Sequence, residues 1–160
     1  MRLVGLVVAM MVVALPAWAD TKPPPTTKAP TASDKAFKPY VGKLVLSPDT
    51  PPGTLDELPN YLEGNLSKDN EYHRTKGPPW PFHLVGVLAK DAKKVTLVVH
   101  DKADKKLTPL LSIELTPMRR IVIAHAEATI AAGFAANKTY VVRLMTGKTV
   151  LAKSELTLHD

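Results

Sequence analysis

The sequence predicts an all-β fold in which about seven short antiparallel strands form a single two-sheet sandwich, from residue 40 to residue 160. Three observations predict this fold class. Apolar and β-branched residues alternate with polar residues at a period of two, which is the pattern of half-buried strands. Gly, Pro, Asn and Asp separate these runs and favour turns. Helical spacing of apolar residues stands out in one segment of this region.

The strand pattern is clear in residues 94–101, where Val95, Leu97 and Val99 share one face while Thr96 and His100 point the other way. Residues 80–89 are apolar on both faces in their second half, which indicates a central strand. The predicted strands are 40–47, 80–89, 94–101, 110–115, 119–128, 139–145 and 149–158.

One short helix is expected in the long first crossover, within residues 54–65, where the leucines and Tyr61 have helical spacing. Thr54 is a plausible N-cap and Gly64 a plausible stop. Pro59 lies in the middle of this segment, so the sequence predicts a helix of one or two turns, or a kink.

The first 19 residues have the layout of a secretory signal peptide. Arg2 precedes an apolar run over residues 3–15, and Pro16 and the small residues around Trp18 follow it. The run is shorter than the roughly 20 residues that a membrane-spanning helix needs, although an uncleaved anchor is the alternative. We therefore expect an exported protein, periplasmic or extracellular, with no membrane span after cleavage of the signal peptide.

Residues 20–39 are predicted to be a disordered, Pro/Thr-rich linker. The segment holds five prolines and few large apolar residues. Such a composition buries too little surface to offset the entropy of ordering, and proline favours extended polyproline conformations. The predicted organisation is thus a signal peptide at 1–19, a linker at 20–39 and a β-sandwich domain at 40–160.

Charge and cysteine content exclude several classes of function. The formal net charge of the full sequence is +6, and its lysines are dispersed around predicted turns. A loose distribution without interleaved aromatic residues does not indicate a nucleic-acid partner. The sequence contains no cysteine, which excludes disulfides, thiolate metal sites and cysteine nucleophiles.

Residues 133–158 carry a resemblance to known folds. Phe134 precedes an Asn-Lys turn, Tyr140 begins the penultimate strand, and a Thr-Gly-Lys turn makes the last hairpin. This arrangement resembles the end of an immunoglobulin-like or fibronectin type III-like β-sandwich, where a "tyrosine corner" occupies the position of Tyr140. The resemblance implies a fold and no activity. The whole layout also resembles small exported bacterial proteins of unknown function.

Motifs of catalysis and cofactor binding are missing from the sequence. It has no G-x-S-x-G element, and its eight glycines form no phosphate-binding loop. The acidic residues of the strand regions fall on separate predicted strands, whereas a glycosidase needs two converging carboxyl groups. Residues 101–106 contain two aspartates among lysines, which favours a hairpin turn over a calcium loop. We therefore predict a non-enzyme without catalytic residues or cofactor.

The five histidines suggest metal binding as an alternative function. They occupy a loop, three predicted strands and the C-terminus, without H-x-H or H-E-x-x-H spacing, so the sequence assigns no metal ligands. His125 shares a face with Ile121 and Ile123 and is expected to be a core or sheet-edge residue. A histidine-based periplasmic metal-binding protein remains the alternative function, and it would need histidines brought together by the fold. The five are His73, His83, His100, His125 and His159.

Residues 71–83 are the richest candidate for a binding site. Trp80 and Phe82 are two residues apart on a face that Leu84 continues, which favours burial of both rings. The alternative is an exposed aromatic platform. The polar half of the segment is expected to be accessible, so Tyr72, His73 and Arg74 are the first candidate ligand-binding residues. Trp80 is a candidate under the platform alternative.

These features together predict an exported, non-catalytic binding or scaffolding module of the cell envelope. The expected partner is a protein or a polysaccharide of the envelope. The sequence does not predict an oligomeric state.

Overall fold

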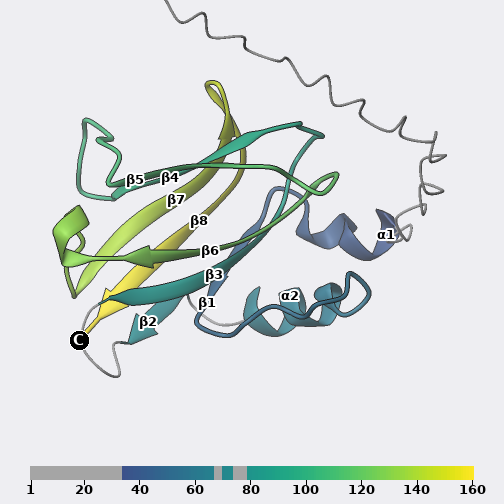
Figure 1. The fold of residues 1–160 in the computed structure, drawn as a ribbon, viewed down its shortest axis with the longest axis horizontal. Coiled ribbons are helices and arrows are strands. Elements are labelled where there is room, and N and C mark those ends of the chain that lie inside the picture. The colour runs from purple at the N-terminus through teal and green to yellow at the C-terminus, as the bar shows by residue number, and fades with distance from the viewer. Residues whose placement is uncertain (1–33, 67–69, 74–78) are drawn as a thin grey trace, which may run out of the picture.

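The computed structural model describes residues 34–66, 70–73 and 79–160, and within them the fold is all-β with two sheets (Figure 1). One sheet has the order β1 (Leu44–Ser47), β3 (Trp80–Val87), β6 (Ile121–Ala128). The other has the order β2 (Glu71–His73), β8 (Thr149–His159), β7 (Lys138–Thr146), β4 (Val95–Asp101), β5 (Leu111–Leu115). The predicted signal peptide and residues 20–33 of the predicted linker lie outside the described residues.

The strand inventory differs from the predicted seven antiparallel strands. The described residues form eight strands, and β2 pairs with β8 in parallel. Strand β2 has three residues, too few for an alternating pattern to stand out in the sequence. Its pairing with β8 depends on a contact between distant parts of the chain, which local periodicity does not encode.

The core between the two sheets is formed by the inward faces of the strands. Trp80, Phe82 and Leu84 of β3 pack there against residues of β4, β7 and β8. Gly86 continues this face, and a Cβ atom at this position would lie 2.5 Å from Leu144 Cδ1. The absence of a side chain at Gly86 thus lets the two sheets approach closely at this point.

A second core covers the outer face of the three-stranded sheet. Phe37, at the end of α1 (Asp34–Phe37), is buried there, together with Leu58 and Leu62 of α2 (Leu58–Leu66). Residues of β1 and β3 complete this core, which explains why β1 is buried at all four positions and why the second half of β3 is apolar on both faces. The prediction that residues 80–89 form a central strand is confirmed, since β3 lies between β1 and β6.

Helix α2 corrects the predicted boundaries of the short helix. It begins at Leu58 and ends at Leu66, so neither Thr54 nor Gly64 bounds it. Pro59 is the second residue of the helix, in the first turn, where a missing N–H removes no intrahelical hydrogen bond. The predicted short helix is present, with nine residues, but the expectation that Pro59 lies in its middle is wrong.

Tyr140 makes the local contact that the resemblance of residues 133–158 implies for it. Its hydroxyl accepts a hydrogen bond from the amide of Ala135 at 2.7 Å and lies 3.2 Å from the carbonyl oxygen of the same residue. The ring is fully buried against Phe134, with ring centres 4.8 Å apart. These contacts join the start of β7 to the loop that follows the 3-10 helix η2 (Ile130–Ala132).

Candidate functional site

The predicted binding residues divide between the core and the surface. Tyr72 lies in β2 opposite Leu158 of β8 and packs partly against the core, and this burial raises the pKa of its phenol. The backbone of His73 pairs with that of His159. Arg74 lies outside the described residues.

Trp80 is a core residue. Its side chain is 1% exposed, and its indole N–H donates to the carbonyl of His159 at 3.1 Å. Phe82 is equally buried, in agreement with the alternation on which the core interpretation was based. An exposed aromatic platform at Trp80 is not compatible with this burial. Tyr72 and Trp80 both contact the end of β8, Tyr72 opposite Leu158 and Trp80 through the carbonyl of His159.

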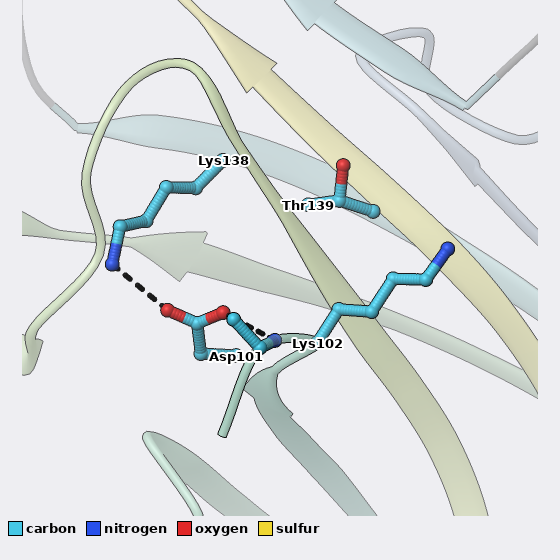
Figure 2. A pocket seen from close by; sticks show the side chains of 5 residues that line it. Asp101, Lys102, Lys138 and Thr139 are labelled. Carbon is cyan, nitrogen blue, oxygen red and sulfur yellow. Dashed lines mark hydrogen bonds and ion pairs between the residues drawn. The ribbon is translucent and has the colours of Figure 1, made fainter. Parts of the chain in front are cut away.

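A shallow, open pocket of about 300 Å³ lies where β4 ends and β7 begins, and Figure 2 shows the side chains that line it. Lys138 Nζ lies 2.8 Å from Asp101 Oδ2, and the amide of Ala103 donates to Asp101 Oδ1 at 2.8 Å. The hydrogen bond from Lys138 and that from Ala103 lower the pKa of Asp101. Lys102 is paired with Glu155 at 2.7 Å. Since both lysines already have carboxylate partners, the pocket has little unpaired charge to offer an anion.

Residues 101–106 form the predicted turn rather than a cation loop. Asp104 accepts hydrogen bonds from the amides of Lys106 and Thr108, each at 2.8 Å, and these bonds lower the pKa of its carboxyl group. An aspartate that bonds the backbone a few residues ahead stabilises a turn. The carboxylates of this loop therefore serve local structure.

His83 and His125 are brought together by the pairing of β3 with β6, which places them directly opposite each other. Their ring centres are 4.8 Å apart. His83 is half-buried, His125 is exposed, and Thr50 Oγ1 lies 3.4 Å from His83 Nε2. Burial lowers the pKa of His83, and His125 adds to this because its positive charge would oppose a second one. The prediction that His125 lies at a sheet edge is confirmed. Its pairing with His83 is not predicted by the positions of the two histidines in the sequence.

Strand β6 is an edge strand, and its register with β3 determines which of its backbone groups point away from the sheet. The amide of Leu88 donates to the carbonyl of Arg120 at 2.7 Å, one position beyond the pair Val87 and Ile121. Hydrogen-bonded pairs alternate along an antiparallel ladder. The residues whose backbone groups point toward β3 are therefore Val122, Ala124, Ala126 and Ala128, whereas those of Ile121, Ile123, His125 and Glu127 point away.

Most of these outward groups have no partner within the described part of the chain. Ile121 exchanges backbone hydrogen bonds of 2.8 and 3.1 Å with Met118. The outward amides and carbonyls of Ile123, His125 and Glu127 pair with no described residue. Ile123 also exposes 42% of its surface. A strip of backbone donors and acceptors with an apolar side chain on it thus follows the outer side of β6.

The other sheet edges are shorter or better protected. Strand β1 has four buried residues and is held to α2, where Ser47 Oγ lies 3.1 Å from Asn65 Oδ1. Strand β2 has three residues, and β5 has five, with Glu114 paired to Lys94 at 2.6 Å. Short or charged edge strands resist pairing with other chains. Strand β6, with eight residues and no Pro, Lys or Arg, is the least protected edge of the described fold.

His100 is an unpaired buried imidazole on β4. It is 2% exposed, and its Nε2 atom has no hydrogen-bond partner among the described residues. Burial lowers its pKa, and Arg143 lowers it further, while Asp104 and Asp101 oppose the shift. The folded state therefore favours the neutral ring.

The free energy of unfolding is expected to fall as the pH is lowered from about 7.5 to about 5.5. In the unfolded chain His100 takes up a proton near the ordinary histidine pKa of about 6.5, whereas in the folded chain His100 stays neutral to lower pH. The folded pKa lies below the unfolded one, so this contribution is complete above pH 6.5 and is lost as the pH falls. Urea denaturation across this range should show a shallower pH dependence for His100→Phe than for the natural protein. Parallel pH profiles for the two proteins would contradict this role of His100.

Within residues 34–66, 70–73 and 79–160, no three His, Asp or Glu side chains gather closely enough to hold a metal ion. Among those residues there is also no helix with the length and apolar character needed to cross a membrane.

Comparisons of this chain with protein-family models, with curated proteins and with solved structures found no match. The described residues form an all-β fold of two sheets, and β6 is the edge strand least protected against pairing with another strand.

Proposed function

We propose that this protein is an exported, non-catalytic binding or scaffolding module of the cell envelope, and that a protein partner adds a strand to the edge of β6. The observation that carries the proposal is the row of outward backbone groups on Ile123, His125 and Glu127. An extended peptide binds such an edge through main-chain hydrogen bonds, and alternate side chains supply specificity. A protein partner fits this feature better than a polysaccharide, because a peptide offers matching donors and acceptors at strand spacing.

Export to the periplasm or the cell exterior is part of this proposal and is based on the signal-peptide pattern of residues 1–19. The immunoglobulin-like classification of the fold is also part of it. The contacts between Tyr140 and Ala135 support that classification, because a tyrosine at the corner before the penultimate strand typically bonds the backbone a few residues upstream. The parallel strand β2 is a departure from the usual arrangement.

Two variants test strand addition at β6. Ile123→Pro removes an outward N–H and leaves the ladder with β3 intact, since proline is tolerated on edge strands whose N–H faces solvent. Ile123→Lys adds a charge that protects edges against pairing. The partner is first identified by cross-linking to the natural protein in envelope fractions, and it is then purified and mixed with each variant. Its affinity for both variants should be at least about tenfold lower than its affinity for the natural protein, a loss of about 1.4 kcal/mol in binding free energy.

Ile130→Lys is the matched control for Ile123→Lys. Ile130 is more exposed, at 59%, but it lies in η2 and not on the edge, so this variant should bind the partner normally. Circular dichroism verifies that each variant is folded. Equal affinity of the natural protein and Ile123→Pro for the reconstituted partner would refute strand addition at this edge.

A further inference from the structure

We propose that His83 and His125 form a binding site for one divalent transition-metal ion, with copper(II) preferred. This site is separate from strand addition, because it uses the side chains on the outer face of the sheet and not the backbone edge. It would give the protein a metal-binding function whether or not β6 pairs with a partner.

The register of β3 and β6 places His83 and His125 in the closer of the two kinds of cross-strand pair. The pair Leu88 and Arg120 is hydrogen-bonded, so the alternation places His83 and His125 in a non-hydrogen-bonded pair. Side chains of such pairs are the closer of the two kinds, because the Cα atoms are about 4.5 Å apart. Both rings therefore leave the sheet side by side on the same face.

The observed spacing suits two ligands of a single ion. A metal–nitrogen bond of about 2.0 Å places the centre of each imidazole about 3.2 Å from the ion, so two rings at 90–110° about the ion have centres about 4.5–5.2 Å apart. The centres of His83 and His125 are 4.8 Å apart with an interplanar angle of 52°. Small side-chain rotations would then direct one nitrogen of each ring to the same ion.

The surroundings favour a cation. Side chains two residues away along a strand share the same face, and here these neighbours are Pro81 and Val85 on β3 and Ile123 and Glu127 on β6, with Ser47 opposite His83 on β1. None of them is basic, and Glu127 is exposed and acidic. No positive side chain in this set opposes binding of a metal ion.

Thr50 can orient one of the two ligands. Its Oγ1 atom lies 3.4 Å from His83 Nε2, and the Nδ1 atom of His83 has no hydrogen-bond partner in the described residues. Histidines that bind metals commonly donate their second N–H to a nearby oxygen, which fixes the tautomer and the ring. With Nε2–H donating to Thr50, Nδ1 would carry the lone pair for the ion.

The number of protein ligands determines which metal is preferred. Two imidazoles leave several coordination positions to water, because no third His, Asp or Glu joins the pair within the described ranges. Structural zinc sites use four protein ligands and catalytic ones three. Imidazole binds first-row metals with an affinity that is highest for Cu²⁺. The expected order is Cu²⁺, then Ni²⁺, then Zn²⁺, with no binding of Mg²⁺ or Ca²⁺, which prefer oxygen ligands.

The test is calorimetric titration of the purified protein, without an affinity tag, with copper(II) sulfate in a weakly coordinating buffer. One ion should bind per chain, and His125→Asn should weaken binding at least tenfold. The paramagnetic resonance spectrum of the copper(II) complex should show two nitrogen ligands in the natural protein and fewer in the variant. Thr50→Val should weaken binding by a smaller factor.

His159→Asn is the matched control, since His159 lies at the end of β8 next to Glu71 and outside this pair. It should bind copper(II) as the natural protein does. His125 is exposed, so its replacement leaves the fold intact, and thermal unfolding without metal verifies this. Absence of binding at equimolar copper(II), or equal affinity of the natural protein and a His83→Asn/His125→Asn double variant, would overturn the proposal.

Discussion

Trp80→Ala is expected to lower the free energy of unfolding by about 3–5 kcal/mol, the usual cost of truncating a buried aromatic side chain. Trp80 is 1% exposed in the core between the two sheets, and its indole N–H bonds the carbonyl of His159. The substitution would leave a cavity and would remove the hydrogen bond to the carbonyl of His159 near the end of β8. Chemical denaturation followed by far-ultraviolet circular dichroism measures the loss.

Two further variants serve as controls for this result. Pro81→Ala changes the next residue, which is exposed, and should alter stability by less than about 0.5 kcal/mol. Trp80→Phe keeps most of the buried volume and should cost less than the alanine substitution, which keeps the test informative if Trp80→Ala fails to fold. A Trp80→Ala protein within about 1 kcal/mol of the natural one would contradict the core position of this side chain.

Tyr140→Phe is expected to cost about 2 kcal/mol, because a buried donor left without an acceptor loses about 1–3 kcal/mol. The hydroxyl of Tyr140 accepts from the amide of Ala135 at 2.7 Å and contacts its carbonyl at 3.2 Å, and the tyrosine is fully buried. Phenylalanine preserves the contact of the ring with Phe134. The difference in urea midpoint, at constant slope, gives the change in free energy.

Tyr61→Phe is the matched control for Tyr140→Phe. The hydroxyl of Tyr61 donates to the carbonyl of Asp49 at 2.9 Å in a more exposed setting, where water can replace the lost hydrogen bond. Its removal should cost less than that of Tyr140. Similar losses in the two variants would mean that the contact with Ala135 carries no special stability.

For the candidate sites, the sequence predicts the face on which a side chain lies but not the residue that it meets on another strand. Alternation of apolar residues predicted that Trp80 and Phe82 face the core, and both are buried. The same alternation placed His125 with Ile121 and Ile123 on one face, which the outer face of β6 confirms. The partner of His125 was not predictable, since His83 meets it through the register of β3 with β6, and register depends on contacts between separate strands.

Helix α2 and strand β2 also depend on contacts between distant parts of the chain that the sequence pattern does not show. Helical spacing of the leucines predicts a helix in the first crossover, but the spacing alone does not show where the helix begins. It therefore puts Pro59 in the middle of the helix and not in the first turn, where the structure has it. Tertiary packing decided this, since burial of Leu58 and Leu62 against the sheet defines the helical part of the segment. Strand β2 is stabilised by pairing with β8 and has little local pattern of its own.

The sequence by itself determined the all-β class and the core faces of most strands, because side-chain alternation and turn chemistry act between residues close in the chain. The hydrogen-bonded tyrosine at the start of β7 was implied by the resemblance of residues 133–158 to the end of an immunoglobulin-like sandwich. Only the tertiary structure decided the order of the strands, the unprotected edge at β6 and the meeting of His83 with His125. These features arise when segments far apart in the sequence pair in one particular register, and a shift of one residue would turn the same side chains to the opposite face.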